Sequence, residues 1–169
     1  MKKWISLSLL YFIILAMFAG CANQTAARQQ PPQSLMIANP WTDWDTLKEA
    51  ESAVGFSFDL PEVIADSYEA VTFRTMNKEL LEVIYRDEDF EICVRKQAGE
   101  GQDISGDYNE YETRTETNRN GSTVITYQNA DNAAMRQQIS YHGYSWSLVA
   151  PNGYWGDSNE DFVNGILGE

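Results

Sequence analysis

Between residues 70 and 150 the chain alternates between apolar and polar positions, which is the period of half-buried β-strands. Short turns such as Asn120-Gly121 and His142-Gly143 separate the alternating runs. Asn-Gly in such a place favours a two-residue hairpin, because both central residues take positive φ. Turns this short connect neighbouring antiparallel strands, so we expect a meander. The predicted strands are Ala70–Met76, Glu79–Arg86, Phe90–Gln97, Tyr111–Asn118, Thr123–Gln128, Ala133–Tyr141 and Tyr144–Val149.

A helix is predicted on each side of this region. Thr46 and Glu49 have the spacing of a capping box at a helix start, and Gly55 is placed to end that helix. A second, short helix is expected to begin at Ser158 and Asp161. The apolar stripes of the two helices are Leu47, Ala50 and Val54 in the first, and Phe162, Val163, Ile166 and Leu167 in the second.

Together these elements predict an α+β fold. We expect one antiparallel meander sheet of about six to seven strands, covered by an N-terminal and a C-terminal helix. A curved half-barrel is the alternative arrangement. The side chains expected on the covered face are Tyr127, Ile139, Tyr141, Tyr144, Trp146 and Leu148.

The N-terminus has a different pattern, typical of a bacterial lipoprotein signal. Lys2 and Lys3 precede an apolar run, Trp4–Phe18, and small residues then lead to Cys21. In such a signal the cysteine receives diacylglycerol and acyl chains such as palmitate, and becomes the mature N-terminus. The alternatives are an ordinary secretory signal and an uncleaved anchor helix. An ordinary signal has a small residue three positions before the cut, where this chain has Phe18.

The predicted domain organisation follows from these patterns. Residues 1–20 form the signal peptide, residues 21–38 a flexible tether, and residues 39–169 a single α+β domain. The tether is polar and carries only the charge of Arg28, so it buries too little apolar area to fold. Its length would hold the domain about 20 Å from the bilayer. We therefore expect a lipid-anchored protein on the extracytoplasmic face of the cell membrane.

The net charge and the cysteine content limit which partners and which reactions we expect for this chain. The formal net charge of −13 disfavours nucleic acid and anionic headgroups as partners, but leaves divalent cations and cationic ligands open. After Cys21 only Cys93 remains, so no disulfide joins two core cysteines. Cys93 lies in an alternating segment and is expected to be a buried thiol rather than a nucleophile. His142, the single histidine, falls in a predicted turn.

Two groups of residues are candidate binding sites. Asp103, Asp107 and Glu110 gather oxygen ligands around a glycine turn, but their spacing is not that of an EF-hand, so a solvated loop is the expectation and Ca²⁺ the weaker alternative. Aromatic side chains with Asn and Asp neighbours are suited to a sugar ring or a peptide, although such residues more often pin helix ends onto a sheet. These aromatic residues are Trp41, Trp44, Tyr154 and Trp155.

The segment NPWTDWDTLKEAESAVGF, from Asn39 to Phe56, resembles the opening of an uncharacterised bacterial domain family. The family occurs in putative lipoproteins and in extracytoplasmic parts of anti-sigma-factor-like membrane proteins. Leu60-Pro61-Glu62 and the segment from Asp103 to Tyr108 are similar to the family as well, so the resemblance spans Asn39 to the C-terminus. It implies an α+β domain without established enzymatic activity and contributes no catalytic residue.

The chain lacks the common catalytic motifs, including Gly-x-Ser-x-Gly, His-Glu-x-x-His and Cys-x-x-Cys. We therefore expect no enzyme and no cofactor. The favoured function is a binding or structural interaction domain with an envelope protein or peptide as partner. The alternative is a lipid or glycan carrier or sensor at the cell envelope. A cell-wall hydrolase is the least favoured hypothesis.

Overall fold

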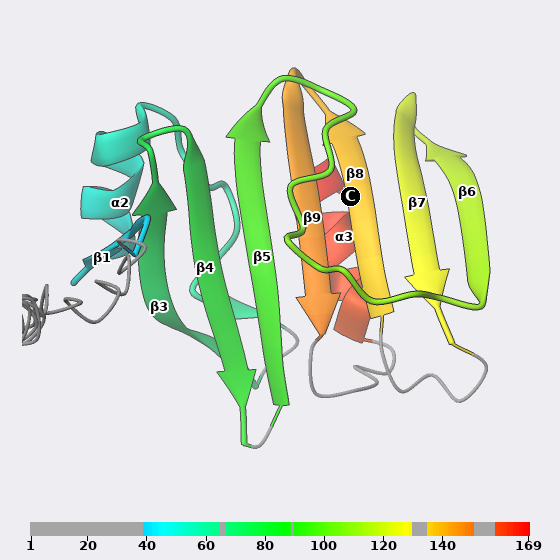
Figure 1. Cartoon of the computed structure of the whole chain (residues 1–169), viewed down its shortest axis with the longest axis horizontal. Helices are drawn as coiled ribbons and strands as arrows, with labels where there is room; N and C mark the ends of the chain where they lie inside the picture. The colour runs from blue at the N-terminus through cyan, green and yellow to red at the C-terminus, as the bar shows by residue number, and fades with distance from the viewer. Residues whose placement is uncertain (1–38, 65–66, 89, 130–134, 151–157) are drawn as a thin grey trace, which may run out of the picture. The chain divides into compact units, whose positions relative to one another are not determined.

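The computed structural model describes residues 39–64, 67–88, 90–129, 135–150 and 158–169. All of them belong to one compact unit, Asn39–Glu169. Within these residues the fold is a nine-stranded, largely antiparallel sheet with two helices, which confirms the predicted α+β class (Figure 1). The helices are α2 (Leu47–Val54) and α3 (Ser158–Leu167). The strands are β1 (Trp41–Trp44), β2 (Val63–Ile64), β3 (Tyr68–Met76), β4 (Leu80–Asp87), β5 (Phe90–Ala98), β6 (Thr113–Arg119), β7 (Ser122–Gln128), β8 (Met135–Tyr141) and β9 (Tyr144–Ala150).

The sheet consists of two meanders rather than one. The strand order is β1-β3-β4-β5-β9-β8-β7-β6, and β2 pairs with β3 beside this path. The meanders join where β5 pairs antiparallel with β9, with Val94 opposite Leu148. The expectation of a single meander of six to seven strands is therefore wrong. The link between β5 and β6 is too long for a tight turn, and it crosses the face of the sheet instead (Figure 1).

The two unpredicted strands are both short. β1 lies in the segment that leads into α2, and its alternation is obscured by polar residues at its centre. β2 has only two residues and pairs through Val63 and Ile64 with the start of β3. Neither strand is long enough to show a period of two in the sequence.

The local signals at turns and helix ends are confirmed. The Thr46 hydroxyl accepts a hydrogen bond from the Glu49 amide at 3.3 Å, and the Glu49 carboxylate accepts one from the Thr46 amide at 3.2 Å. Gly55 ends α2 with a φ of 83°. At the β6–β7 hairpin, Asn120 and Gly121 have φ values of 49° and 82°.

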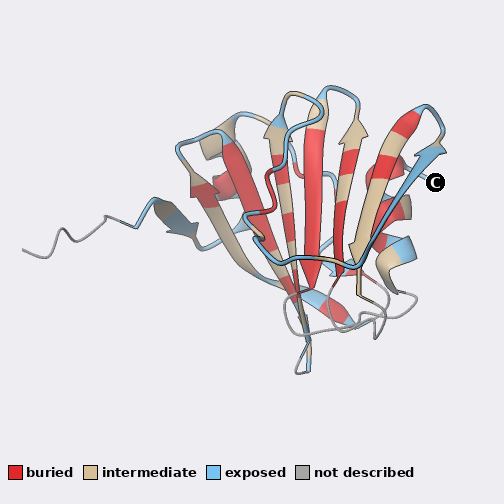
Figure 2. Cartoon of the chain, turned by 45° about the vertical axis from the view of Figure 1, so that its right-hand side comes forward, coloured by how far each residue is buried: buried red, intermediate tan, exposed pale blue. Residues whose placement is uncertain are grey.

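The main core lies on the sheet face that α2 and α3 cover. Phe162 of α3 is fully buried, and its ring centroid lies 5.1 Å from that of Tyr85 and 5.9 Å from that of Tyr68. The helices cover separate parts of this face, and the segment between α2 and β2 completes the cover with buried Phe58 and Leu60. Burial is concentrated in the central strands, whereas the edge strand β6 is exposed (Figure 2).

One side chain predicted for the covered face lies on the other face. Tyr127 stands opposite Arg136 in the β7–β8 pairing, whereas its neighbour Thr126 stands opposite Gln137. The covered face of β8 carries Gln137 and Ile139, so Tyr127 points away from the helices. The prediction for Tyr127 is therefore wrong, because a polar threonine occupies the covered position beside it.

Candidate functional site

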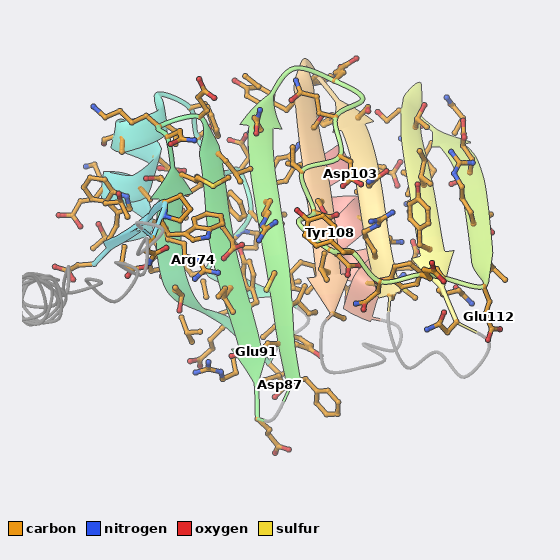
Figure 3. The ribbon with its side chains drawn as sticks, viewed as in Figure 1. Arg74, Asp87, Glu91, Asp103, Tyr108 and Glu112 are labelled. Atoms are coloured by element: carbon orange, nitrogen blue, oxygen red, sulfur yellow. The ribbon has the colours of Figure 1, made fainter. Side chains whose placement is uncertain are left out.

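The face of the sheet opposite the helices is partly covered by the segment between β5 and β6. We call this segment, residues 99–112, the strap. It passes in front of β9, β8 and β7, and Asp103, Tyr108 and Glu112 lie along it (Figure 3). The strap contains no lysine or arginine. Its acidic residues are Glu100, Asp103, Asp107, Glu110 and Glu112.

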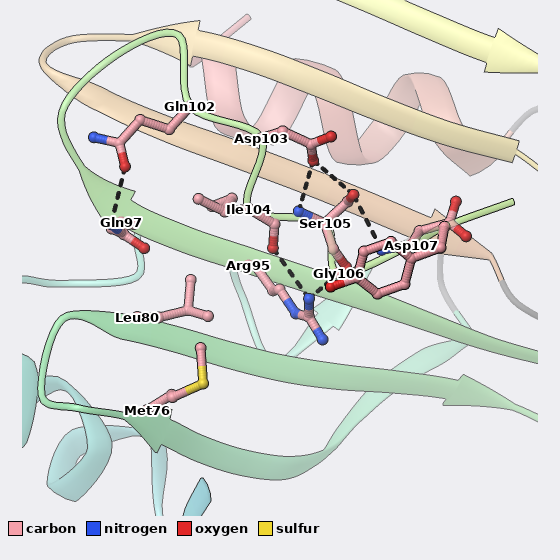
Figure 4. Close-up of a pocket in the computed structure, with 11 residues that line it drawn as sticks. Met76, Leu80, Arg95, Gln97, Gln102, Asp103, Ile104, Ser105, Gly106 and Asp107 are labelled. Carbon is pink, nitrogen blue, oxygen red and sulfur yellow. Dashed lines mark hydrogen bonds between the residues drawn. The ribbon is translucent and has the colours of Figure 1, made fainter. Parts of the chain in front are cut away.

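Arg95 of β5 fixes the middle of the strap. Its guanidinium Nη1 donates to the backbone carbonyls of Ile104, at 3.1 Å, and of Ser105 (Figure 4). Gly106 follows in a left-handed conformation with a φ of 58°, and a Cβ at this position would clash with Arg95 Nη1. The strap can approach the arginine this closely because residue 106 is glycine.

A buried carboxylate holds Arg95 in place. Glu82 of β4 is fully buried; it accepts from Arg95 Nε at 2.6 Å and forms a second ion pair with Arg74. The Trp41 ring lies over this cluster, with its centroid 4.6 Å from the guanidinium carbon of Arg74 and 5.3 Å from that of Arg95. Two cations therefore compensate the buried charge of Glu82, and the aromatic ring packs against both cations.

Arg136 of β8 fixes the second half of the strap. Its Nη1 donates to the Asp107 carbonyl at 3.0 Å and lies 3.5 Å from a carboxylate oxygen of Asp103. The guanidinium stacks on Tyr127, with 4.1 Å between its carbon and the ring centroid. Partial burial acts to raise the pKa of Asp103, but hydrogen bonds from Ser105 and the charge of Arg136 hold this pKa below its ordinary value.

The layer between strap and sheet is polar and incompletely paired. Within the described part of the chain, Arg136 Nε and Ser147 Oγ are buried without a hydrogen-bond partner. Ile104 is the buried apolar side chain that the strap contributes to this layer. The strap is therefore positioned mainly by directional hydrogen bonds, and much less by apolar burial.

A pocket of about 460 Å³ opens between the strap and the ends of β3, β4 and β5 (Figure 4). Met76 and Leu80 form its apolar side, and Arg95, Gln97 and Gln102 contribute polar groups. Tyr108 stands at the rim with 95% of its surface exposed. We call this site the strap pocket. It combines an apolar wall, a partly buried guanidinium and an exposed aromatic ring.

The structure separates the predicted aromatic residues. Trp41 and Trp44 stand opposite Met76 and Phe73 of β3, so their side chains lie on opposite faces of the sheet. Trp44 packs against the main core and donates from Nε1 to Thr75 Oγ1 at 3.0 Å. Tyr154 and Trp155 lie outside the described residues, as does Cys21.

Two of the carboxylates considered as Ca²⁺ ligands already accept hydrogen bonds from nearby residues of the strap. Asp103 Oδ1 accepts from the Ser105 amide at 3.0 Å, and Asp107 Oδ1 accepts from the Asn109 amide at 3.1 Å, while Glu110 is exposed. Among the described residues, no cluster of three or more His, Cys, Asp or Glu side chains has the geometry to hold a metal ion. Asp103 and Asp107 instead stabilise turns of the strap.

Cys93 lies on the strap-covered face of β5. Burial, together with the charge of nearby Glu82, raises the pKa of its thiol to about 11. The thiol is therefore protonated at neutral pH and is a poor nucleophile.

Sequence reasoning missed the residues that build the site. Arg95 and Arg136 lie at polar positions of alternating strands, where an arginine that binds the strap looks the same as one in solvent. Glu82 carried a clearer signal, because it interrupts the apolar run Leu80-Leu81-Glu82-Val83-Ile84. A charge in such a run is buried, and a buried charge requires a partner.

Comparison with family models, curated proteins and solved structures gave no match to this chain. The resemblance of residues 39–56 to the lipoprotein domain family therefore stays a prediction. In the part of the chain that the structure describes, no helix has the length and apolar character needed to span a membrane.

Proposed function

We propose that this protein is a lipid-anchored lipoprotein of the extracytoplasmic membrane face, and that its domain binds a basic segment of another envelope protein at the strap pocket. The observation that carries the binding proposal is the strap itself. It is an acidic segment fixed by two arginines, and it places an exposed tyrosine beside a pocket. The anchor proposal is supported by the lipoprotein-type pattern that ends at Cys21.

The charge of the strap indicates which type of partner it would bind. The basic groups beneath the strap, Arg95 and Arg136, are engaged with strap carbonyls, whereas Glu100, Glu110 and Glu112 face solvent. The outer surface of the strap is therefore acidic and favours a lysine- or arginine-rich segment. The apolar wall formed by Met76 and Leu80 gives such a segment a place for one aliphatic side chain.

Tyr108 is the residue best placed to contribute binding energy. Tyrosine is enriched at interface hot spots because it buries a large rigid surface at little conformational cost. Solvent surrounds nearly all of this side chain, although the backbone on either side of it is hydrogen-bonded. A fixed backbone reduces the entropy lost on binding.

The other hypotheses have less support at the strap. A lipid carrier requires an apolar cavity, whereas the strap pocket is lined by Arg95, Asp103 and Asp107 as well as by apolar groups. A hydrolase requires a carboxylic acid with a raised pKa. Burial acts to raise the pKa of Asp59 and the pKa of Asp103, but hydrogen bonds hold both below the ordinary value, so neither group is suited to that role.

Peptide binding to the full protein in detergent micelles tests the site. The probe is a fluorescent lysine peptide with one central leucine, and its control carries alanine in place of the leucine. We expect the leucine peptide to bind more tightly, and Tyr108→Ala to weaken its binding by at least about tenfold. Phe90→Ala is the matched control, because Phe90 is also exposed but lies at the β4–β5 hairpin. Equal effects of the two substitutions, or preference for a glutamate peptide, would contradict the proposal.

The anchor is tested by Cys21→Ala in cells. We expect the parent protein to be released from membranes by detergent and not by high salt, because two or more acyl chains hold a protein durably. The variant should accumulate as a larger precursor. If the variant is processed and located like the parent protein, the anchor proposal is wrong.

A further inference from the structure

Lys96 is the one lysine among the buried residues of the described chain, and it lies on the face opposite the strap. It follows Ile92 and Val94 on the helix-covered side of β5 and is 2% exposed. Its ammonium group donates to the Ser57 carbonyl at 2.7 Å and to Asp59 Oδ2 at 2.6 Å. An ammonium has three N–H donors, and the described hydrogen bonds use two of them.

Aromatic rings surround this ammonium group. Nζ lies 4.3 Å from the ring centroid of Tyr144 and 4.6 Å from that of Trp146, and Phe56 is next at 5.7 Å. These contacts hold the side chain in place at low solvent exposure. A buried, fixed donor is characteristic of a binding site more than of a solvated surface.

A hollow of about 470 Å³ opens beside Lys96. Tyr141, Tyr144 and Trp146 provide its aromatic wall, and Gly165 of α3 and Gly168, just after the helix, line one side. We call it the Lys96 hollow. Its volume lies within the range of small-molecule pockets.

Asp59 supplies a hydrogen-bond acceptor beside Lys96 in the lining of the hollow. Its side chain is 59% exposed, although Oδ2 is bonded to Lys96. Its backbone has a φ of 66°, a conformation that asparagine and aspartate adopt more readily than other residues with a side chain. Burial acts to raise the pKa of Asp59, but hydrogen bonds from Lys96 and Ser57 hold this pKa below the ordinary value. The carboxylate is therefore ionised at neutral pH and accepts hydrogen bonds.

We infer that the Lys96 hollow binds a neutral sugar ring. The ion pair places a donor and an acceptor side by side, which matches two adjacent hydroxyl groups, since each hydroxyl both donates and accepts. The C–H face of the ring would pack against the half-buried Tyr144, because His142 already stacks on the ring of Tyr141 with 3.8 Å between centroids. This site is separate from the strap pocket and does not depend on the peptide-binding proposal.

Charge disfavours the other ligand classes at this hollow. A carboxylate ligand would gain a hydrogen bond from the third N–H of Lys96 but would meet Asp59 and a strongly acidic protein. A cationic ligand would meet Lys96 itself. An acyl chain would leave the ion pair without solvent and without new partners. A neutral polyol satisfies both members of the pair.

Saturation-transfer NMR with the full protein in a detergent that has no sugar headgroup tests the inference. The probes are glucose and N-acetylglucosamine, with acetate and methylammonium as charged comparisons. We expect transfer to the ring protons of at least one sugar, with a Kd of roughly 1 mM for a ligand of this size. Asp59→Asn should weaken the sugar by about tenfold or more, because it removes a charged acceptor while the positive φ is retained.

Two further variants keep the test decisive. Asp43→Asn is the matched control, since Asp43 is an exposed acid of β1 on the strap-covered face, and sugar binding should not change. If Asp59→Asn does not fold, Tyr144→Leu removes the ring and should also abolish the sugar signal. Transfer to acetate or methylammonium with none to either sugar would overturn the inference. Sugar affinity that is unchanged in Asp59→Asn or Tyr144→Leu, or no sugar signal from the parent protein, would overturn it too. Tyr108→Ala should leave sugar binding intact.

Discussion

The two faces of the sheet are buried in different ways. The helix-covered face is closed by apolar side chains, among them Phe58, Leu148 and Phe162, which are fully buried. The strap-covered face is closed by arginine hydrogen bonds to backbone carbonyls, around the buried Glu82. Apolar burial supplies most of the free energy of folding, whereas directional polar contacts chiefly determine geometry. The difference assigns stability to one face and the positioning of the strap to the other.

Glu82 on the strap-covered face and Lys96 on the helix-covered face are both buried charges, and they are compensated differently. Glu82 lies between two arginines beneath Trp41. Lys96 has one carboxylate partner and borders a hollow. A closed cluster of this kind fixes structure, whereas a charged group with a remaining donor at a hollow can bind a ligand.

The largest loss of stability is expected from the helix-covered face. Phe162→Ala removes a fully buried ring that contacts Tyr85 and Tyr68, so unfolding free energy should fall by about 3–5 kcal/mol. Urea unfolding followed by tryptophan fluorescence measures the change. A loss below about 1 kcal/mol would show that α3 contributes little to the core, contrary to the assignment of stability to this face.

A smaller but still large loss of stability is expected when the buried charge of Glu82 is removed. Glu82→Gln keeps the side-chain shape but leaves Arg74 and Arg95 without their buried carboxylate, which should cost about 3 kcal/mol in the same urea measurement. Glu91→Gln is the matched control, because Glu91 pairs with Arg86 near the surface and should change stability by less than about 1 kcal/mol. Equal losses in the two variants would mean that burial of Glu82 is energetically unimportant.

Loosening the strap should have a local effect. Arg136→Met removes the hydrogen bond to Asp107 and the ion pair with Asp103, while it keeps much of the packing on Tyr127. We expect a global loss of about 1–2 kcal/mol, and faster amide hydrogen exchange in strap residues than in β5 or β9. Arg114→Met, on the exposed strand β6, should leave strap exchange unchanged. Uniformly faster exchange across the sheet would argue against a separately positioned strap.

The smallest effect on the strap is expected when the pH is lowered. The pKa of Asp103 is lower in the folded protein than its ordinary value of 3.8, so its stabilising contribution is complete above that pH. It is lost as the pH falls below 3.8 toward the folded pKa. We therefore expect strap amides to lose protection in this acid range before the core unfolds, and Asp103→Asn to remove part of that pH dependence. Protection that is insensitive to pH in this range would contradict the contribution of Asp103.

Much of the framework was predictable from the sequence because its signals are local. The capping box at Thr46, the end of α2 at Gly55 and the Asn120-Gly121 hairpin depend on residues a few positions apart. The pairing of β5 with β9 depends on residues about fifty positions apart, and the alternating pattern does not choose between neighbours. For the same reason the sequence predicted the turn at Gly106 but not the arginine beneath it.

Photocrosslinking in intact cells tests most directly the claim that the strap side is the recognition surface. Tyr108 is replaced by photoreactive benzoylphenylalanine, and Phe90, an exposed aromatic residue away from the strap, is replaced in a separate strain. We predict a protein adduct of discrete mass from position 108 that does not form from position 90. The same adduct from both positions, or from position 90 alone, would contradict the account.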